Sequence, residues 1–268
     1  MTGRRAQTPR HWHAACHGTG MDIASNVAAS LLAAQQRALD VTANNFANAN
    51  TPGYKSERVQ FSDWLSPQKD ASTPPGGRVV AYAQDRATWR DLHAGNLTHT
   101  GNPLDLALTG DGYFTVNTPR GPRLTRDGRF SLQANGTISD SSGAALLDTT
   151  GKPIQLAPTD TQLTVAGDGT LSSANGALGK IGVVRPTDPM RMTGEGSTQF
   201  RADTPTVAVA SPGLVQGAVE DSNVQPVTEM TRMLDGQQQF QFLAQFVQAE
   251  SDRQQQAIDK ILPTSTSS

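Results

Sequence analysis

Four side chains near the start of the chain are of types that can bind a transition metal. His11, His13, Cys16 and His17 lie close together, and imidazole and thiolate are ligands that zinc and copper accept. Their spacing matches no closed structural site, and no apolar pattern around them supplies a scaffold for four ligands. We therefore expect no metal and no other cofactor.

Catalytic residues are sparse in the rest of the chain. All five histidines lie at or before His99, so a histidine general base is missing from everything that follows. The sequence has no Gly-x-Ser-x-Gly, His-Glu-x-x-His or Gly-x-x-x-x-Gly-Lys motif. Asp and Glu remain, so hydrolysis by paired carboxylates stays open as an alternative. We expect the protein not to be an enzyme.

Two glycine-aspartate segments, residues 110–114 and 125–130, invite comparison with phosphate-binding or calcium-binding loops. Neither leads into a helix N-terminus that could hold a phosphate, and neither has the acidic spacing of a calcium loop. Strand-like residues precede and follow each one. The segments are therefore typical of hairpin turns.

Apolar residues alternate with polar ones from Leu104 onward, and turn dipeptides interrupt the alternation. Asp127-Gly128, Asn135-Gly136, Asp168-Gly169 and Asn175-Gly176 are examples. This pattern predicts a central all-β domain over residues 101–204, built as an antiparallel sandwich or a partly closed barrel.

A helical period of three and four residues flanks this domain on both sides. The sequence thus predicts an α+β protein whose terminal helices are of coiled-coil type. The seams are rich in Ala and Gln, which gives each contact little buried area, so the helices should need neighbouring molecules. The expected assembly seam consists of Val27, Leu31, Ala34, Ala38, Val41, Met230, Met233, Phe240, Ala244, Val247, Ile258 and Ile261.

The first helical pattern ends in a segment of unusual composition, residues 44–55. Asparagine side chains can bond the carbonyl groups that a helix end leaves unpaired, Pro52 prevents continuation, and Gly53 supplies a turn. The motif residues are Asn44, Asn45, Ala47, Asn48, Thr51, Pro52, Gly53 and Tyr54.

This motif resembles the N-terminal signature of the bacterial flagellar basal-body rod and hook family. Phe46 departs from it, because the family usually has Leu there. Residues 100–114 and 125–128 resemble the family's entry into its β domain, and Ser222-Asn223-Val224 with Glu229-Met230 resembles its C-terminal signature. The similarity covers most of residues 21–262.

The resemblance implies a structural axial subunit of the flagellar rod that polymerises through its terminal helices and transmits torque from motor to hook. The length from Met21 is most like a proximal-rod protein; a distal-rod protein of the same family or a secreted oligomeric β-module are the alternatives. The implied partners are other rod subunits and the flagellar type III export apparatus. The implied location is the periplasm-spanning rod, reached without a cleavable signal peptide.

Composition is consistent with an extended, modular subunit. Hydrophobic residues make up 36% of the chain and the net charge is −2, so neither nucleic acid nor a membrane is an expected partner. No apolar run approaches the ~20 residues needed to span a bilayer. Residues 1–20 lack any period, and we expect translation to begin naturally at Met21.

The expected organisation has six parts. Phe61 and Leu65 are expected on one helical face. They would form a packing pair or, as the resemblance implies, an export contact. The parts are a non-native or disordered extension (1–20), an N-terminal helix and turn that pairs with 222–262 (21–65), a linker and extended segment (66–100), the β domain (101–204), an extended return segment (205–221), and the C-terminal helix and tail (222–268).

Overall fold

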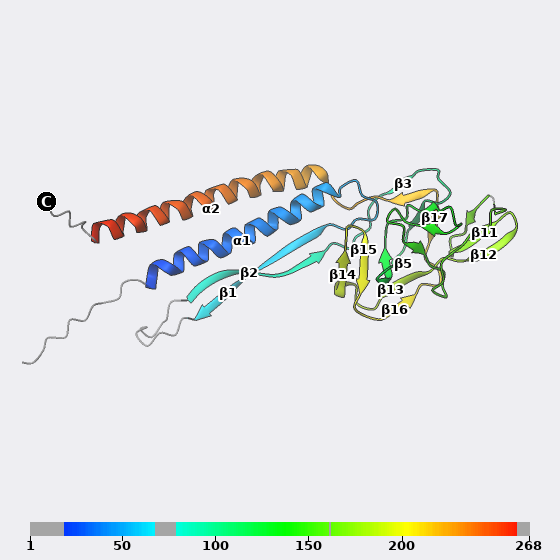
Figure 1. Cartoon of the computed structure of the whole chain (residues 1–268), viewed down its shortest axis with the longest axis horizontal. Coiled ribbons are helices and arrows are strands. Elements are labelled where there is room, and N and C mark those ends of the chain that lie inside the picture. Colours follow the sequence, from blue (N-terminus) through cyan, green and yellow to red (C-terminus); the bar gives the residue numbers. More distant parts are fainter. Residues whose placement is uncertain (1–18, 68–78, 161, 262–268) are drawn as a thin grey trace, which may run out of the picture. The chain divides into compact units, whose positions relative to one another are not determined.

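The computed structural model describes residues 19–67, 79–160 and 162–261, and the side chains of 27–60, 88–160, 162–257 and 259–260. The histidine and cysteine cluster of residues 11–17 lies outside this part. The chain divides into two compact units. Described residues within 37–60 and 86–237 form the second unit, and residues 19–36, 61–67, 79–85 and 238–261 belong to the first. Figure 1 shows the helices and strands, coloured by their position along the sequence.

Two helices flank the strands in sequence: α1 spans Thr19–Ala47 and α2 spans Pro226–Ile261. They cover the two segments with the predicted helical period, whereas the coiled-coil packing expected of them stays a prediction. Pro226 occupies the first helical position, and Glu229 lies in the first turn, where a negative charge is favourable. Neither described helix is long and apolar enough to cross a membrane.

A two-stranded sheet follows α1, formed by β1 (Glu57–Pro67) and β2 (Val79–Arg90). The prediction that Phe61 and Leu65 lie on a helix was wrong, because both belong to β1. Residues four apart share a face in a strand as well as in a helix, so this short apolar pair could not distinguish the two. Their side chains lie outside the described set.

Among the described residues, sixteen further strands, most of them two to five residues long, occupy the second unit, with the short 3₁₀ helix η1 (Pro189–Arg191) among them. The strands are β3 (Leu97–His99), β4 (Leu106–Leu108), β5 (Tyr113–Thr118), β6 (Gly121–Thr125), β7 (Ser131–Leu132), β8 (Ile138–Ser139), β9 (Ala145–Leu146), β10 (Thr164–Val165), β11 (Thr170–Ser173), β12 (Gly176–Lys180), β13 (Val183–Pro186), β14 (Met192–Glu195), β15 (Gln199–Ala202), β16 (Thr206–Ala208), β17 (Leu214–Gln216) and β18 (Ala218–Glu220).

The largest sheet has the order β14-β15-β6-β5-β9-β8-β7, with β13 also paired to β5 and β16 paired to β13. A separate sheet has the order β10-β11-β12. The protein is thus mostly β with two helices, as the alternating pattern predicted. The strands form open sheets, whereas we expected a sandwich or a partly closed barrel.

The main core of the second unit lies between these strands. Phe114, Val116 and Leu146 are fully buried there, and the Phe114 and Phe130 rings meet edge to face. A smaller cluster joins Tyr113, Leu124 and Phe200. β5 contributes to both clusters, with Phe114 and Val116 in the main core and Tyr113 in the smaller one. Successive side chains of a strand point to opposite faces, so both faces of β5 are buried.

The segment 205–221 returns the chain to the beginning of the β region. It was expected to be extended, and it contains three strands. Two of them pair antiparallel with early strands: β17 with β4, and β18 with β3. This pairing brings Glu220, at the end of β18, close to the turn that follows α1.

Candidate functional site

The asparagine-rich turn closes the end of α1 as its composition predicted. The Asn48 backbone amide donates to the carbonyl of Asn44 at 3.1 Å, and the Asn48 side chain donates to the same carbonyl at 2.9 Å. The Thr51 hydroxyl donates to the Asn48 side chain. These bonds satisfy carbonyl groups that a helix C-terminus leaves unpaired.

Gly53 is required at the turn for two reasons. Its φ angle is +69°, in the region that favours glycine. A Cβ atom there would also lie 2.3 Å from the Arg126 carbonyl carbon and from the Asp127 nitrogen, which real atoms cannot do. The Gly53 amide donates to the Glu220 carbonyl at 2.8 Å. The turn therefore packs directly on the backbone of the β region.

Asn45, in the last turn of α1, connects three segments of the chain. Its buried side chain accepts from the Glu57 amide at 2.8 Å and donates to the Glu57 carbonyl at 2.8 Å. It also accepts from the Tyr54 hydroxyl at 3.1 Å and donates to Glu229 at 3.5 Å. The end of α1 and the first turn of α2 are thus held together.

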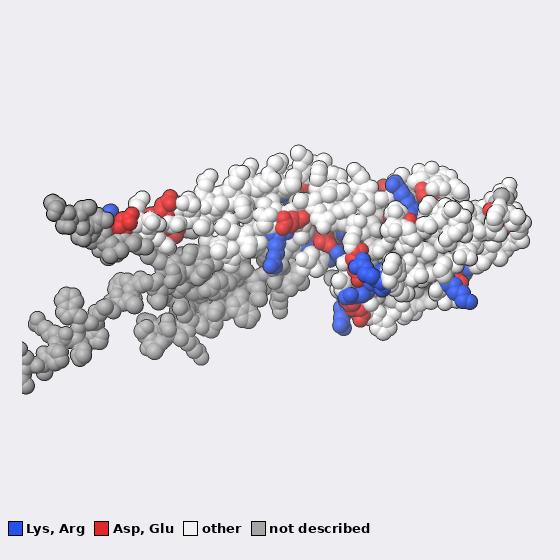
Figure 2. Space-filling model, in the orientation of Figure 1, with Lys and Arg blue, Asp and Glu red and all other residues white. Residues whose placement is uncertain are grey.

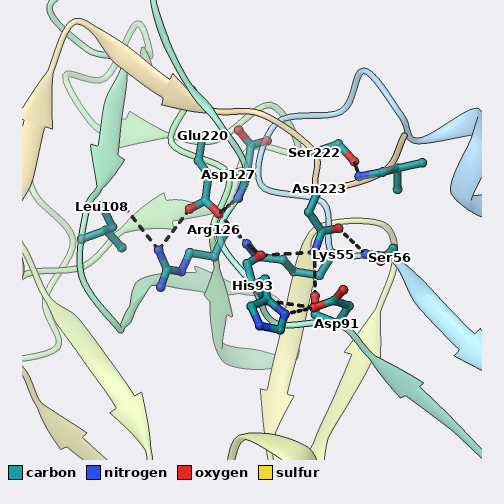
Figure 3. A network of polar contacts seen from close by, with 12 residues as sticks. Lys55, Ser56, Asp91, His93, Leu108, Arg126, Asp127, Glu220, Ser222 and Asn223 are labelled. Atoms are coloured by element: carbon teal, nitrogen blue, oxygen red, sulfur yellow. Dashed lines mark hydrogen bonds and ion pairs between the residues drawn. The ribbon is translucent and has the colours of Figure 1, made fainter. Parts of the chain in front are cut away.

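A buried ion network lies next to this contact (Figure 3). The Glu220 carboxylate pairs with the Lys55 amine and, at 3.0 Å, with the Arg126 guanidinium. Lys55 and Glu220 are each 1% exposed. Lys55 also donates to the His93 carbonyl at 2.8 Å, and Arg126 donates to that of Gly110 at 2.9 Å.

The C-terminal family motif contributes Asn223 to the same network. Its side chain accepts from the Ser56 amide at 2.8 Å and donates to the carbonyls of Asp91, at 2.8 Å, and His93, at 3.2 Å. One amide group therefore bonds the backbone of two segments far apart in sequence (Figure 3).

Glu229 is the second buried carboxylate of the region. It is 1% exposed and pairs with Arg58 at 2.8 Å and with Arg232 at 2.6 Å. Both arginines are more exposed than their partner, so the carboxylate lies inside and the cations lie toward solvent.

We call the residues of these contacts together the junction: Asn45, Gly53, Tyr54, Lys55, Arg58, Arg126, Glu220, Asn223, Glu229 and Arg232.

Burial shifts the acidity of two junction side chains. It raises the pKa of the Tyr54 phenol to about 12, and the nearby Glu57 charge adds to that effect. It lowers the pKa of the Lys55 amine, an effect that the Glu220 carboxylate partly offsets. Both shifts follow from the cost of a charged form in a poorly solvated place.

The motif residues meet at this junction, but the sequence did not reveal their partners. Lys55 ends the segment 44–55 that contains the motif, and Arg126 lies in the predicted turn segment 125–130. Glu220 was not singled out as a partner, because no local pattern indicates which carboxylate a buried lysine will meet. The only signal of this ion pair in the sequence was a lysine next to a predicted tight turn.

The predicted seam residues have varied exposure within one chain. On α1, Ala34 is buried, Val27, Ala38 and Val41 are half-buried, and Leu31 is 39% exposed. On α2, Met233, Phe240 and Val247 are half-buried, whereas Met230 and Ala244 are exposed. The side chains of Ile258 and Ile261 lie outside the described set.

Several described aspartates hold turns. Asp105 accepts from Thr100 and Asn102, and Asp140 accepts from Ser142 and Ala144. Burial raises the pKa of the Asp127 carboxyl, which accepts from the Arg129 amide. Within the described residues no cluster of His, Cys, Asp or Glu could hold a metal ion.

Outside the junction, charges of both signs lie side by side on the surface (Figure 2). The Glu195 carboxylate is an example: Arg123 binds it with two nitrogens at 3.0 and 3.2 Å, and Arg120 and Arg201 lie within 3.7 Å. The bond from Arg123 lowers the pKa of Glu195. This mixed pattern gives no reason to expect a polyanionic partner.

Three family models match the segments that form the junction and the β region. Residues 23–55 match the flagella basal body rod protein model, and residues 107–173 match the flagellar hook protein FlgE/F/G D1 domain. Residues 215–260 match the C-terminal model of the flagellar basal body rod FlgEFG protein.

Similar proteins span nearly the whole chain. The flagellar basal-body rod protein FlgF of Mesorhizobium japonicum is 36% identical over 236 residues, covering 87% of this chain and 95% of that protein. FlgF of Caulobacter vibrioides is 35% identical, covering 90% and 98%. The rod protein FlgG of Bacillus subtilis is 32% identical, covering 84% and 93%.

The fold and the junction are those of a structural subunit that connects two terminal helices to a β region. The chain belongs to the flagellar basal-body rod protein family. It is therefore a structural component of the flagellar basal-body rod, where proteins of this kind assemble with other basal-body components.

Proposed function

We propose that the chain is a subunit of the proximal rod, that it polymerises through its terminal helices, and that the polymer transmits torque from the motor to the hook. The relatives named FlgF support the proximal assignment, because those described above are 35–36% identical, against 32% for FlgG of Bacillus subtilis. A distal-rod role is the second candidate, since FlgG relatives also match over most of the chain.

The junction is the observation that carries this proposal. A torque-bearing subunit must not let its helices pivot freely on its β region. Buried ion pairs and side-chain bonds to backbone groups resist such movement, because each broken contact leaves a buried polar group unsatisfied. Lys55, Glu220 and Asn223 supply such contacts between three segments.

The exposed apolar residues of the helices support assembly through them. Leu31 on α1 is 39% exposed, and on α2 Phe242 and Phe246 are 70% and 52% exposed. Large apolar side chains that remain exposed on a helix typically mark a protein contact. Contacts between different surfaces of identical subunits generate helical filaments when the rotation between subunits does not close a ring.

Export through the flagellar type III apparatus completes the proposal. We propose that the chain reaches the rod without a cleavable signal peptide and that Phe61 and Leu65 contact the export machinery. Both residues are in β1, so an extended peptide, rather than a helical face, would be the recognised form. A secreted oligomeric β-module is disfavoured by the family membership.

The test introduces a charge into each helical seam. Leu31→Asp and Val247→Asp should prevent incorporation, because an unpaired charge buried between subunits costs several kcal/mol in every copy. Ala33→Asp and Ala249→Asp place the same charge at exposed positions outside the seam and should be incorporated.

Incorporation is measured as recovery of each variant in purified basal bodies. Export to the periplasm and normal thermal unfolding of the β region are checked in parallel. Recovery of both seam variants at the level of the controls would show that the helices are not the assembly surface.

A further inference from the structure

An apolar groove lies on the second unit and includes Leu92, whose neighbours Asp91 and His93 accept from Asn223 of the junction. Its volume is about 230 Å³, and its lining includes Trp89, Leu92, Met190, Met192 and Phe200. Phe200 is 2% exposed, whereas Trp89 and Met190 are 40% and 67% exposed. A flexible methionine and a tryptophan edge are typical of surfaces that accommodate a partner.

The first three turns of α2 carry an apolar ridge in the same unit. Val227, Met230 and Leu234 are 80%, 50% and 48% exposed. Their spacing of three and four residues places them along one face of the helix. These exposures show that the ridge does not occupy the groove of its own chain.

The charges beside the two surfaces are complementary. Arg191 follows Met190 at the groove, and Asp235 follows Leu234 at the ridge. Among the described residues neither side chain forms an ion pair, whereas Arg90 of the groove is paired with Glu57 and Arg232 near the ridge is paired with Glu229. Arg191 and Asp235 therefore carry opposite charges outside any described ion pair. Arg191 also acts electrostatically on Asp203, and Asp111 is a further charge near Trp89 and Met190.

We propose that the groove binds the α2 ridge of a second copy of this chain, with Met230 between Trp89 and Met190 and with Asp235 paired to Arg191. The proposal rests on the rod function, because it specifies one contact of that polymer. Ridge and groove are different surfaces, so each copy offers both, and the contact can repeat from copy to copy along an open helix.

Three ridge side chains bury far less than the ~1,000 Å² that a stable interface needs. The contact should therefore be occupied only where other contacts already hold the copies together, as multivalent binding allows. It would fix the register between copies rather than drive their association.

The test is a disulfide between copies in assembled basal bodies. Full-length chain with Cys16→Ser, Met190→Cys and Met230→Cys is expressed in place of the natural protein, and isolated basal bodies are oxidised. We expect a ladder of dimers and higher multimers without reductant. The matched control replaces Met190→Cys by Leu132→Cys, which is also an exposed apolar position at 51%, and should give no ladder.

Incorporation separates this proposal from the rod function. If the cysteine pair is incorporated normally but gives no ladder, or links only to a different rod protein, the groove contact is wrong and the rod assignment stands. If neither this variant nor the unmodified chain is recovered in basal bodies, the rod function itself fails, and the contact fails with it.

A charge exchange gives a second measurement. Arg191→Glu and Asp235→Arg should each reduce the yield of the cross-link several-fold in the cysteine background, and the two together should restore it. An unchanged yield in both single variants would overturn the proposed ion pair and the orientation it defines.

Discussion

Glu220 is one of the two buried carboxylates of the junction, and it interacts with two buried cations and a backbone amide. It accepts from the Gly95 amide at 3.1 Å as well as pairing with Lys55 and Arg126. A group with this many partners leaves several of them unsatisfied when it is removed, so single substitutions here should be far more damaging than at surface pairs.

Lys55→Met should lower the free energy of unfolding by about 3–5 kcal/mol, because it leaves a buried carboxylate with one cation fewer. Urea unfolding at pH 7 measures the change. Arg253→Met is the control, since its pair with Glu250 is exposed, and it should have little effect. Equal effects of the two substitutions would contradict the role assigned to Lys55.

Gly53→Ala should be more destabilising than Gly151→Ala. Both glycines have positive φ angles, +69° and +83°, so both substitutions incur backbone strain of about 1–3 kcal/mol. Only at Gly53 would the new Cβ also meet backbone atoms, whereas Gly151 has open space. Thermal unfolding of the two variants compares the effects, and a similar loss would mean that the turn is not closely packed.

The raised pKa of the buried Tyr54 phenol predicts that the stability of the fold declines at alkaline pH. The unfolded phenol loses its proton near pH 10, and the folded one near 12. The folded state therefore retains the proton over this interval, and the free energy of unfolding should fall by up to about 3 kcal/mol as pH rises from 10 to 12.

Tyr54→Phe should make that decline shallower while leaving the pH dependence between 6 and 9 unchanged. The measurement is urea unfolding at a series of pH values. A decline of identical slope in the variant would assign it to other groups.

At the scale of elements, α2 has two parts with different surroundings. In the first turns Glu229 and Gly236 are buried. Between residues 238 and 257 no described residue is fully buried. Helices in proteins owe most of their stability to packing against other elements. The distal part of α2 should therefore be weakly ordered until neighbouring subunits cover it.

Hydrogen exchange on the isolated chain should therefore be fast across residues 238–257 and slow in β5 and β6. The α2 residues near Glu229 should exchange at an intermediate rate, since the junction holds the first turn. Uniform protection along α2 would show that the helix is stable without neighbours.

At the scale of the whole molecule, the chain combines an anchored β region with apolar surfaces that no described part of it covers. We expect it to be monomeric at micromolar concentration, because each exposed apolar patch is small compared with a stable interface. Analytical ultracentrifugation measures this. A stable dimer in dilute solution would indicate a larger single contact than any described above.

The sequence by itself determined the local features. The three-and-four spacing indicated both helices, the glycine dipeptides indicated the short strands, and the asparagine motif indicated the turn at the end of α1. Each of these depends on residues within a few positions of one another, where dihedral preferences and periodicity act directly. The same local reasoning failed at residues 57–67, because a single apolar pair fits a strand as well as a helix.

Only the tertiary structure decided what the motif residues contact. Lys55 meets Glu220 across 165 positions, and Asn45 meets Glu229 across 184. The pairing of β18 with β3 sets the first of these contacts, and strand register over such distances depends on the packing of the whole β region. Local sequence does not encode which buried charges will be neighbours, because that follows from the folded path of the chain.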